Sequence, residues 1–431
     1  MKKRFHIRRQ ASAFRVRKTF LFFCLIGLFF ISTILTVIVR KSINNFLFLL
    51  LIGAASAFGM SARYKKTVVL LLLAYMMLLG SSLAISFIYG IELSCAIKQL
   101  FYYLKPALFF IVGYCFLDRK YLDVLFKAVF AYMILGTIFA ISYPDCLSEL
   151  TTRKLVAMGY AERNSEAHLW VFNSIFVGLL KHFWVTRGGF VLRNPTFVFS
   201  PLESGFILAF LCSYFYYMSR FSSRRRYRLL FYASLVMLIT TLVRSALLFF
   251  VVTYFIYIIL FIHRGRRRIV CGMLMLIGVV IFCKIFYDDV YFLFAKESSA
   301  SIHLSNLGEA LNHIFTYPGG TGMGSSGWHG DKKSPYFTYS EGSLFSSLIE
   351  NGIQFLAVYI VMIMILYRKS RYFLFPIFIG YCTASFLLPI GFSSLFNALF
   401  FTAVGVTLRK YWRTPATADD FLLEGMAQPI G

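Results

Sequence analysis

Two glutamates, Glu341 and Glu350, stand where a glycine-rich polar loop runs into an apolar stretch. The loop and the start of that stretch read TYPGGTGMGSSGWHGDKKSPYFTYSEGSLFSSLIENG, residues 316–352. A carboxylate in or against a bilayer is costly, so acids at such a position are usually functional or paired with another group. The pattern therefore points to polar chemistry at a membrane boundary.

The same loop carries a series of glycines, in which Gly320, Gly322 and Gly324 occupy alternate positions. Glycine permits positive φ and a close approach of the backbone, so the amides of such a loop can bind a phosphate or a sugar hydroxyl. The loop lacks the lysine and the strand–helix context of a P-loop. A merely flexible loop is the alternative interpretation.

Three charged residues upstream have the same character. Arg193 precedes an apolar segment, Glu203 lies inside it beside Pro201, and Arg244 occupies the turn TTLVRSALL. An arginine fork at a turn is the group that grips a phosphate or pyrophosphate through two parallel hydrogen bonds. Alternatively, Arg244 reaches lipid phosphates, and Glu203 is the buried partner of a nearby arginine.

The elements that must position these residues are membrane helices. Of the 431 residues, 59% are hydrophobic and only 14% are charged, a composition that excludes an ordinary soluble domain. Apolar runs long enough to cross a bilayer recur, and in lipid they must be helical. We predict an all-α polytopic protein with twelve spans, ten or eleven being the alternative, near residues 20–39, 45–61, 67–89, 100–117, 122–143, 196–219, 229–242, 246–262, 269–287, 342–367, 372–390 and 391–408.

The distribution of lysine and arginine predicts which side each loop faces. The basic N-terminal block and the runs at 224–228 and 264–268 fall on one side, which the positive-inside rule assigns to the cytoplasm. Both termini, including the tail 409–431, are then cytoplasmic. Two long segments, 144–195 and 288–341, face outward as the larger loops of a single membrane domain, 1–431, and we expect function to reside there.

The composition and motifs also exclude several classes of function. The net charge of +26 is explained by these topology signals, so no nucleic-acid partner is predicted. Neither a Walker-type motif nor a dinucleotide fingerprint occurs, and the cytoplasmic loops are short, which argues against ATP-driven chemistry and against a cofactor. The adjacent Asp288 and Asp289 do not demand a metal. A stretch at 167–185 is predicted to lie on the membrane surface or to pack as a short helix over the bundle.

The order of motifs resembles the bacterial Wzy polymerase and O-antigen ligase superfamily. The carrying pieces are SSASIH ahead of an amphipathic helix, the turn PGGTGMG, and the segment SEGSLFSSLIENG. The run from Arg193 through Phe197 to Pro201 and the turn from Thr241 to Ser245 are similar to upstream pieces of that family. The resemblance covers roughly residues 190–408.

The resemblance implies a GT-C-like enzyme of the bacterial inner membrane with a periplasmic active site. Its substrates would be oligosaccharide repeat units linked to undecaprenyl pyrophosphate in the lipid bilayer, with a flippase and a chain-length regulator as possible partners. Arg193 and Arg244 would bind the pyrophosphate, and Glu341 would be the general base. Glu203, His303 and the loop glycines would contact substrate.

Three other functions remain open. Ligases of the superfamily carry a histidine nine residues before the glutamate that corresponds to Glu350, whereas Glu341 stands there in this chain. That difference favours a polymerase over an O-antigen ligase. A flippase or other transporter would be expected to show paired repeats and charges near the midplane, which the sequence lacks. A scaffolding membrane protein would not explain the buried acids.

Glu350 is expected to be structural, and His313 and His329 to be solvated loop residues.

Overall fold

A computed structural model gives the fold of the chain. It describes residues 19–27, 30–31, 34, 66–157, 170–172, 185–187, 190–222, 224–261, 298–327, 330–340, 342–387 and 393–413. The predicted spans 45–61 and 269–287, part of 20–39, and the tail beyond 413 lie outside these ranges. So do Glu341, His329, and Asp288 and Asp289.

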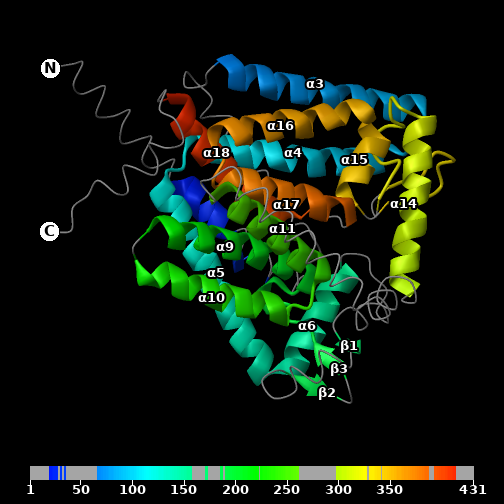
Figure 1. Cartoon of the computed structure of the whole chain (residues 1–431). Helices are drawn as coiled ribbons and strands as arrows, with labels where there is room; N and C mark the ends of the chain where they lie inside the picture. Colours follow the sequence, from blue (N-terminus) through cyan, green and yellow to red (C-terminus); the bar gives the residue numbers. More distant parts are fainter. Residues whose placement is uncertain are drawn as a thin grey trace. The chain divides into compact units, whose positions relative to one another are not determined.

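The described chain is mostly helical (Figure 1). Three of the described helices are long and apolar enough to cross a membrane, within 68–88, 93–115 and 119–142, and several shorter apolar helices accompany them. These helices support the prediction of a helical membrane protein. The number of spans and the GT-C-like fold stay predictions.

The backbone contacts divide the chain into two compact units. The first unit comprises residues 1–65, 104–247 and 393–431, and the second comprises 66–103 and 248–392. The first unit contains the C-terminal part of α4 (Leu93–Cys115), followed by α5 (Arg119–Ser142), α6 (Pro144–Ala157), η1 (Thr196–Val198), α9 (Pro201–Phe221), α10 (Arg225–Thr240) and α18 (Ser394–Arg413). The second contains α3 (Lys66–Ile88), most of α11 (Arg244–Phe261), α14 (Ser298–Thr316), α15 (Ser343–Asn351), η3 (Ile353–Phe355), α16 (Leu356–Lys369) and α17 (Leu374–Leu387).

Helix α9 forms the centre of the first unit and is buried along nearly its whole length. Ser200 caps its N-terminus by accepting a hydrogen bond from the Glu203 backbone N–H, and Pro201 occupies the first turn, where its missing N–H costs nothing. Helix α10 packs along α9 (Figure 1). Gly205 allows close packing against the turn after α10, because a Cβ there would lie 3.0 Å from the Val243 Cβ.

A small sheet corrects the prediction for the first outer loop. Strand β3 (Phe190–Leu192) lies between β1 (Trp170–Phe172) and β2 (Thr186–Arg187), and both pairings are antiparallel. The stretch 167–185, predicted as a helix, thus contributes a strand at 170–172. Its aromatic and β-branched residues, Trp, Val and Phe, are typical strand formers. Helix α6 supplies the start of the same loop.

In the second unit, the segment predicted as the span 342–367 is helical but is not one continuous helix. Helix α15 ends at Gly352, whose φ of +75° is outside the helical region, and a 3₁₀ turn precedes α16. The loop of residues 319–327, here called the glycine loop, packs against this break. A Cβ on Gly352 would lie 2.5 Å from the carbonyl carbon of Gly319. Only glycine combines this φ with such a close approach.

Candidate functional site

The segment that carries Arg193 is hydrogen-bonded to the end of α10. The Asn194 backbone N–H donates to the Thr240 carbonyl at 3.0 Å, and its side-chain amide donates to the hydroxyls of Thr240 at 3.1 Å and Thr137 at 2.8 Å. Arg193 directly precedes this asparagine, and Arg244 follows Thr240 by one turn. The structure therefore joins the two chain segments that carry the predicted pyrophosphate-binding arginines, which are distant in sequence.

Arg244 is the first residue of α11, and its side chain is exposed, whereas Arg193 is half-buried. A cation at a helix N-terminus opposes the helix dipole, so Arg244 does not contribute to helix stability through its charge. The turn before it, with Leu242 and Val243 buried, presents the guanidinium at the surface. Both the helix end and the side chain are positive, which suits an anionic group.

The backbone around these arginines is strained. Thr196, Phe199 and Leu242 have φ values of 47°, 53° and 52°, in the left-handed region that non-glycine residues rarely adopt. Such conformations cost about 1–3 kcal/mol each and persist where the surroundings impose them. Here the Asn194 side chain accepts from the Thr196 N–H, and the Ser204 hydroxyl donates to the Pro195 carbonyl at 2.6 Å. The loop is held in one conformation despite its strain.

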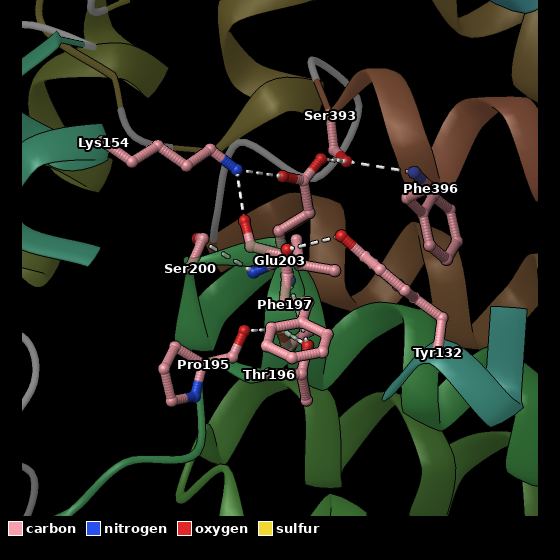
Figure 2. A network of polar contacts seen from close by, with 11 residues as sticks. Tyr132, Lys154, Pro195, Thr196, Phe197, Ser200, Glu203, Ser393 and Phe396 are labelled. Carbon is pink, nitrogen blue, oxygen red and sulfur yellow. Dashed lines mark hydrogen bonds and ion pairs between the residues drawn. The ribbon is translucent and has the colours of Figure 1, made fainter. Parts of the chain in front are cut away.

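Glu203 is the centre of a polar network at the start of α9 (Figure 2). Its carboxylate forms an ion pair with the Lys154 ammonium at 3.5 Å and accepts a hydrogen bond from the Ser393 hydroxyl at 2.5 Å. The Lys154 ammonium also donates to the Val198 carbonyl. One acid thus connects α6, α9 and the residue before α18.

The sequence analysis named neither Lys154 nor Lys105 as a site residue. Both lysines are buried, with side chains that interact electrostatically with Glu203. Burial lowers the pKa of Lys154, and the neighbouring Glu203 carboxylate partly offsets this shift. Lys105 could have been identified, because it lies inside the predicted span 100–117 and a charge within a membrane is rare and usually paired. Lys154 lies in no predicted span and gives no such signal.

The Lys154–Glu203 pair gives a test of this network. We expect Lys154→Met and Glu203→Gln each to lower the free energy of unfolding by about 3–5 kcal/mol, because each leaves a buried charge without its partner. The double variant should be more stable than the sum of the two losses predicts. Thermal unfolding of the purified protein in detergent measures this coupling. Strictly additive losses would contradict a direct interaction.

The glycine loop adopts the predicted conformation. Gly320, Gly322 and Gly324 have φ values of 85°, 92° and 85°, and the loop is buried from Gly320 to Gly327. A Cβ on Gly322 would lie 2.4 Å from the Ser86 backbone nitrogen. The amides that could cradle a substrate are used within the chain, because Gly322 donates to the Glu350 carbonyl and Gly324 to the Glu350 carboxylate.

His313 differs from its predicted position. His313 belongs to α14 and is half-buried, so the expectation of a solvated loop residue is wrong. Its Nδ1 lies 2.8 Å from the Thr338 hydroxyl, and its Nε2 lies 3.2 Å from the Thr321 hydroxyl. His313 thus connects α14 to the glycine loop through Thr321 and to the segment before α15 through Thr338. His303 also lies on α14, but its side chain is outside the described part of the structure.

The pH dependence of stability tests this contact. Burial lowers the pKa of His313 below 6.5, so between that lowered value and 6.5 the unfolded chain binds more protons than the folded one. The contribution of His313 is complete above pH 6.5 and is lost as the pH falls through the folded-state pKa. Over that window the slope is at most about 1.4 kcal/mol per pH unit. Unfolding midpoints of wild type and His313→Gln should differ more at pH 7.5 than at pH 5; parallel curves would refute this.

The described residues separate into two sets, one in each unit. The first unit holds Arg193, Glu203 and Arg244 with the two buried lysines, and the second holds the glycine loop with Glu350. Among the residues that the structure describes, no three histidine, cysteine or acidic side chains are placed to hold a metal ion. Comparison with protein-family models, with curated proteins and with solved structures finds no match.

Proposed function

We propose that the chain is a polymerase that joins oligosaccharide repeat units linked to undecaprenyl pyrophosphate. The observation that carries the proposal is the hydrogen-bonded junction of Asn194 with Thr240, which fixes the segments of Arg193 and Arg244 in one unit with Glu203 and Lys154. A transferase with a pyrophosphate leaving group needs cationic groups placed in advance. The hydrogen-bonded backbone supports the proposal, because it holds together the segments that carry the two arginines.

In this proposal the acceptor sugar hydroxyl attacks the anomeric carbon of the growing glycan. The bond from that carbon to the pyrophosphate oxygen breaks, and undecaprenyl pyrophosphate leaves with the electron pair. Arg193 and Arg244 stabilise the charge that develops on the leaving group. Glu341 takes the proton of the hydroxyl. Glu203 holds Lys154 and the start of α9 in place, and His303 contributes to substrate binding.

The setting proposed for this reaction is the periplasmic face of the bacterial inner membrane, with both termini in the cytoplasm. The long apolar helices support a membrane location. Twelve spans in a GT-C-like arrangement, a flippase that delivers substrate and a regulator of chain length belong to the same proposal.

The experiment that tests the function uses purified protein in lipid with undecaprenyl-pyrophosphate-linked repeat units. Wild type should convert them to a ladder of polymers on a gel. Parallel reactions replace the acceptor by lipid A core, and sealed vesicles report passage of the lipid-linked unit. Transfer only to lipid A core would make the protein a ligase. Passage without a ladder would make it a flippase and would refute the catalytic proposal.

A further inference from the structure

Glu350 is an acid in the interior of the second unit, with a fully buried side chain on a helix in which every residue is buried. An isolated ionised carboxylate in such surroundings would be very costly, so the groups that bond it must compensate. The Gly324 N–H donates to one carboxylate oxygen at 3.0 Å, and the Tyr103 hydroxyl donates to the other at 2.5 Å. Both oxygens are thus engaged by the chain itself.

The backbone of Glu350 binds the same surroundings. Its carbonyl accepts hydrogen bonds from the Gly322 N–H and from the Ser82 hydroxyl, each at 3.0 Å. The neighbouring Ser86 hydroxyl donates to the Met323 carbonyl. Glu350 therefore connects the glycine loop to α3 and, through Tyr103, to α4.

Hydrogen bonds also connect the glycine loop to the residues that precede Glu341 in the chain. The residue after Gly324, Ser325, accepts a hydrogen bond from the Thr338 N–H at 3.0 Å, three residues before Glu341. On the other side, the Ser346 hydroxyl donates to the Ser340 carbonyl, and the Ser346 N–H donates to the Gly342 carbonyl. The two residues that flank Glu341 are thus anchored to α15, and the strand-like segment before them is anchored to the glycine loop.

We infer that Glu350 is a positioning residue that holds the glycine loop and, through it, the described residues that precede Glu341. It acts as a hydrogen-bond acceptor for Gly324 and Tyr103 and does not touch substrate. The effect that we expect Glu350 to have on catalysis rests on the proposed function, because it requires Glu341 to be the base. The effect that we expect Glu350 to have on the glycine loop does not depend on the proposed function.

The chain carries its own probe of loop closure. Lys332 and Lys333 are exposed in the loop between the glycines and α15, so trypsin can cut there when the loop opens locally. Arg153, on α6 in the other unit, is 43% exposed and serves as an internal control for unfolding elsewhere. Mass spectrometry of the full-length protein in lipid nanodiscs gives the rate of cleavage at each site.

Three variants separate the roles. Glu350→Leu keeps the volume but removes both acceptors, and it should raise cleavage after Lys332 or Lys333 about 10-fold or more while cleavage after Arg153 is unchanged. Glu350→Gln keeps an acceptor for Gly324 and can donate to the Tyr103 oxygen, so its cleavage rate should stay within about threefold of wild type. Glu309→Gln, on the exposed face of α14, should change nothing.

In the polymerisation assay, Glu350→Leu should lower kcat at least about 10-fold with little change in KM, and Glu350→Gln should retain most of the activity. Unchanged loop cleavage in Glu350→Leu, or an equal rise at Arg153, would refute the positioning role. Tyr103→Phe, which removes one donor, gives the same decision if Glu350→Leu does not accumulate. A loosened loop with normal kcat would refute the link to Glu341. Absence of any ladder from wild type would refute the proposed function and leave the cleavage result to decide on the loop.

Discussion

Replacing Glu341 by glutamine is expected to lower the rate of polymerisation about 100- to 10,000-fold, the usual contribution of a general base. Glutamine has nearly the same size as glutamate but cannot take a proton at neutral pH. Binding of the lipid-linked donor should be retained, because the arginines that we propose to bind the pyrophosphate are unchanged. The initial rate of ladder formation at saturating substrate measures the effect.

A second substitution at the same position separates a base from a mere negative charge. Glu341→His supplies a different base, and histidine is the residue that ligases of the superfamily resembled by this sequence carry at this place. This variant should recover part of the activity lost in Glu341→Gln. The matched control is Glu309→Gln, because Glu309 is exposed on α14. Full activity in Glu341→Gln would exclude the catalytic role.

The sequence predicted the positions of helices well where one apolar run forms one unbroken helix. The predicted spans 67–89 and 122–143 correspond to α3 (Lys66–Ile88) and α5 (Arg119–Ser142). In a bilayer, a run of apolar residues can only be a helix, so composition alone determines the element. The same argument placed α17 and α18 near their predicted positions.

The prediction was wrong where contacts from distant segments override the local pattern. The apolar run 342–367 gives no sign of a break except Gly352, and its interruption depends on the close approach of Gly319. The strand at 170–172 likewise depends on pairing with residues 190–192. Local propensity cannot reveal either, because the partner lies elsewhere in the chain.

The sequence predicted which charged residues belong to the candidate site, but it did not predict which other residues bond to them. Arg193, Glu203 and Arg244 were identified because charges near a membrane are costly. Their supports, Asn194 and Lys154, were not, since an asparagine in a loop and a lysine in the polar stretch TTRKLVA are unremarkable in sequence. The glycines were identified for their amides, yet in the described structure two of these amides bind Glu350 rather than a substrate. Which acceptor an amide uses is a property of the tertiary fold.

The exposed arginine at the start of α11 gives the other large expected effect. Arg244→Ala should reduce polymerisation about 100- to 1,000-fold, as does removal of one group that stabilises charge in a transition state. Arg244→Lys should recover only part of the loss, because an ammonium keeps the charge but not the bidentate fork. Arg225→Ala is the control, since Arg225 is also exposed and begins α10 on the predicted cytoplasmic side.

The alternative role of Arg244, reaching to lipid phosphates, predicts a different outcome for the same variants. In that case Arg244→Ala would alter the amount of protein in the membrane, while the rate per molecule would stay at the wild-type level, and lysine would substitute fully for arginine. Rates normalised to folded protein therefore decide between the two roles. A selective loss in kcat that lysine repairs only in part assigns Arg244 to the leaving group, because only a ligand that forms two parallel hydrogen bonds distinguishes the fork from the charge.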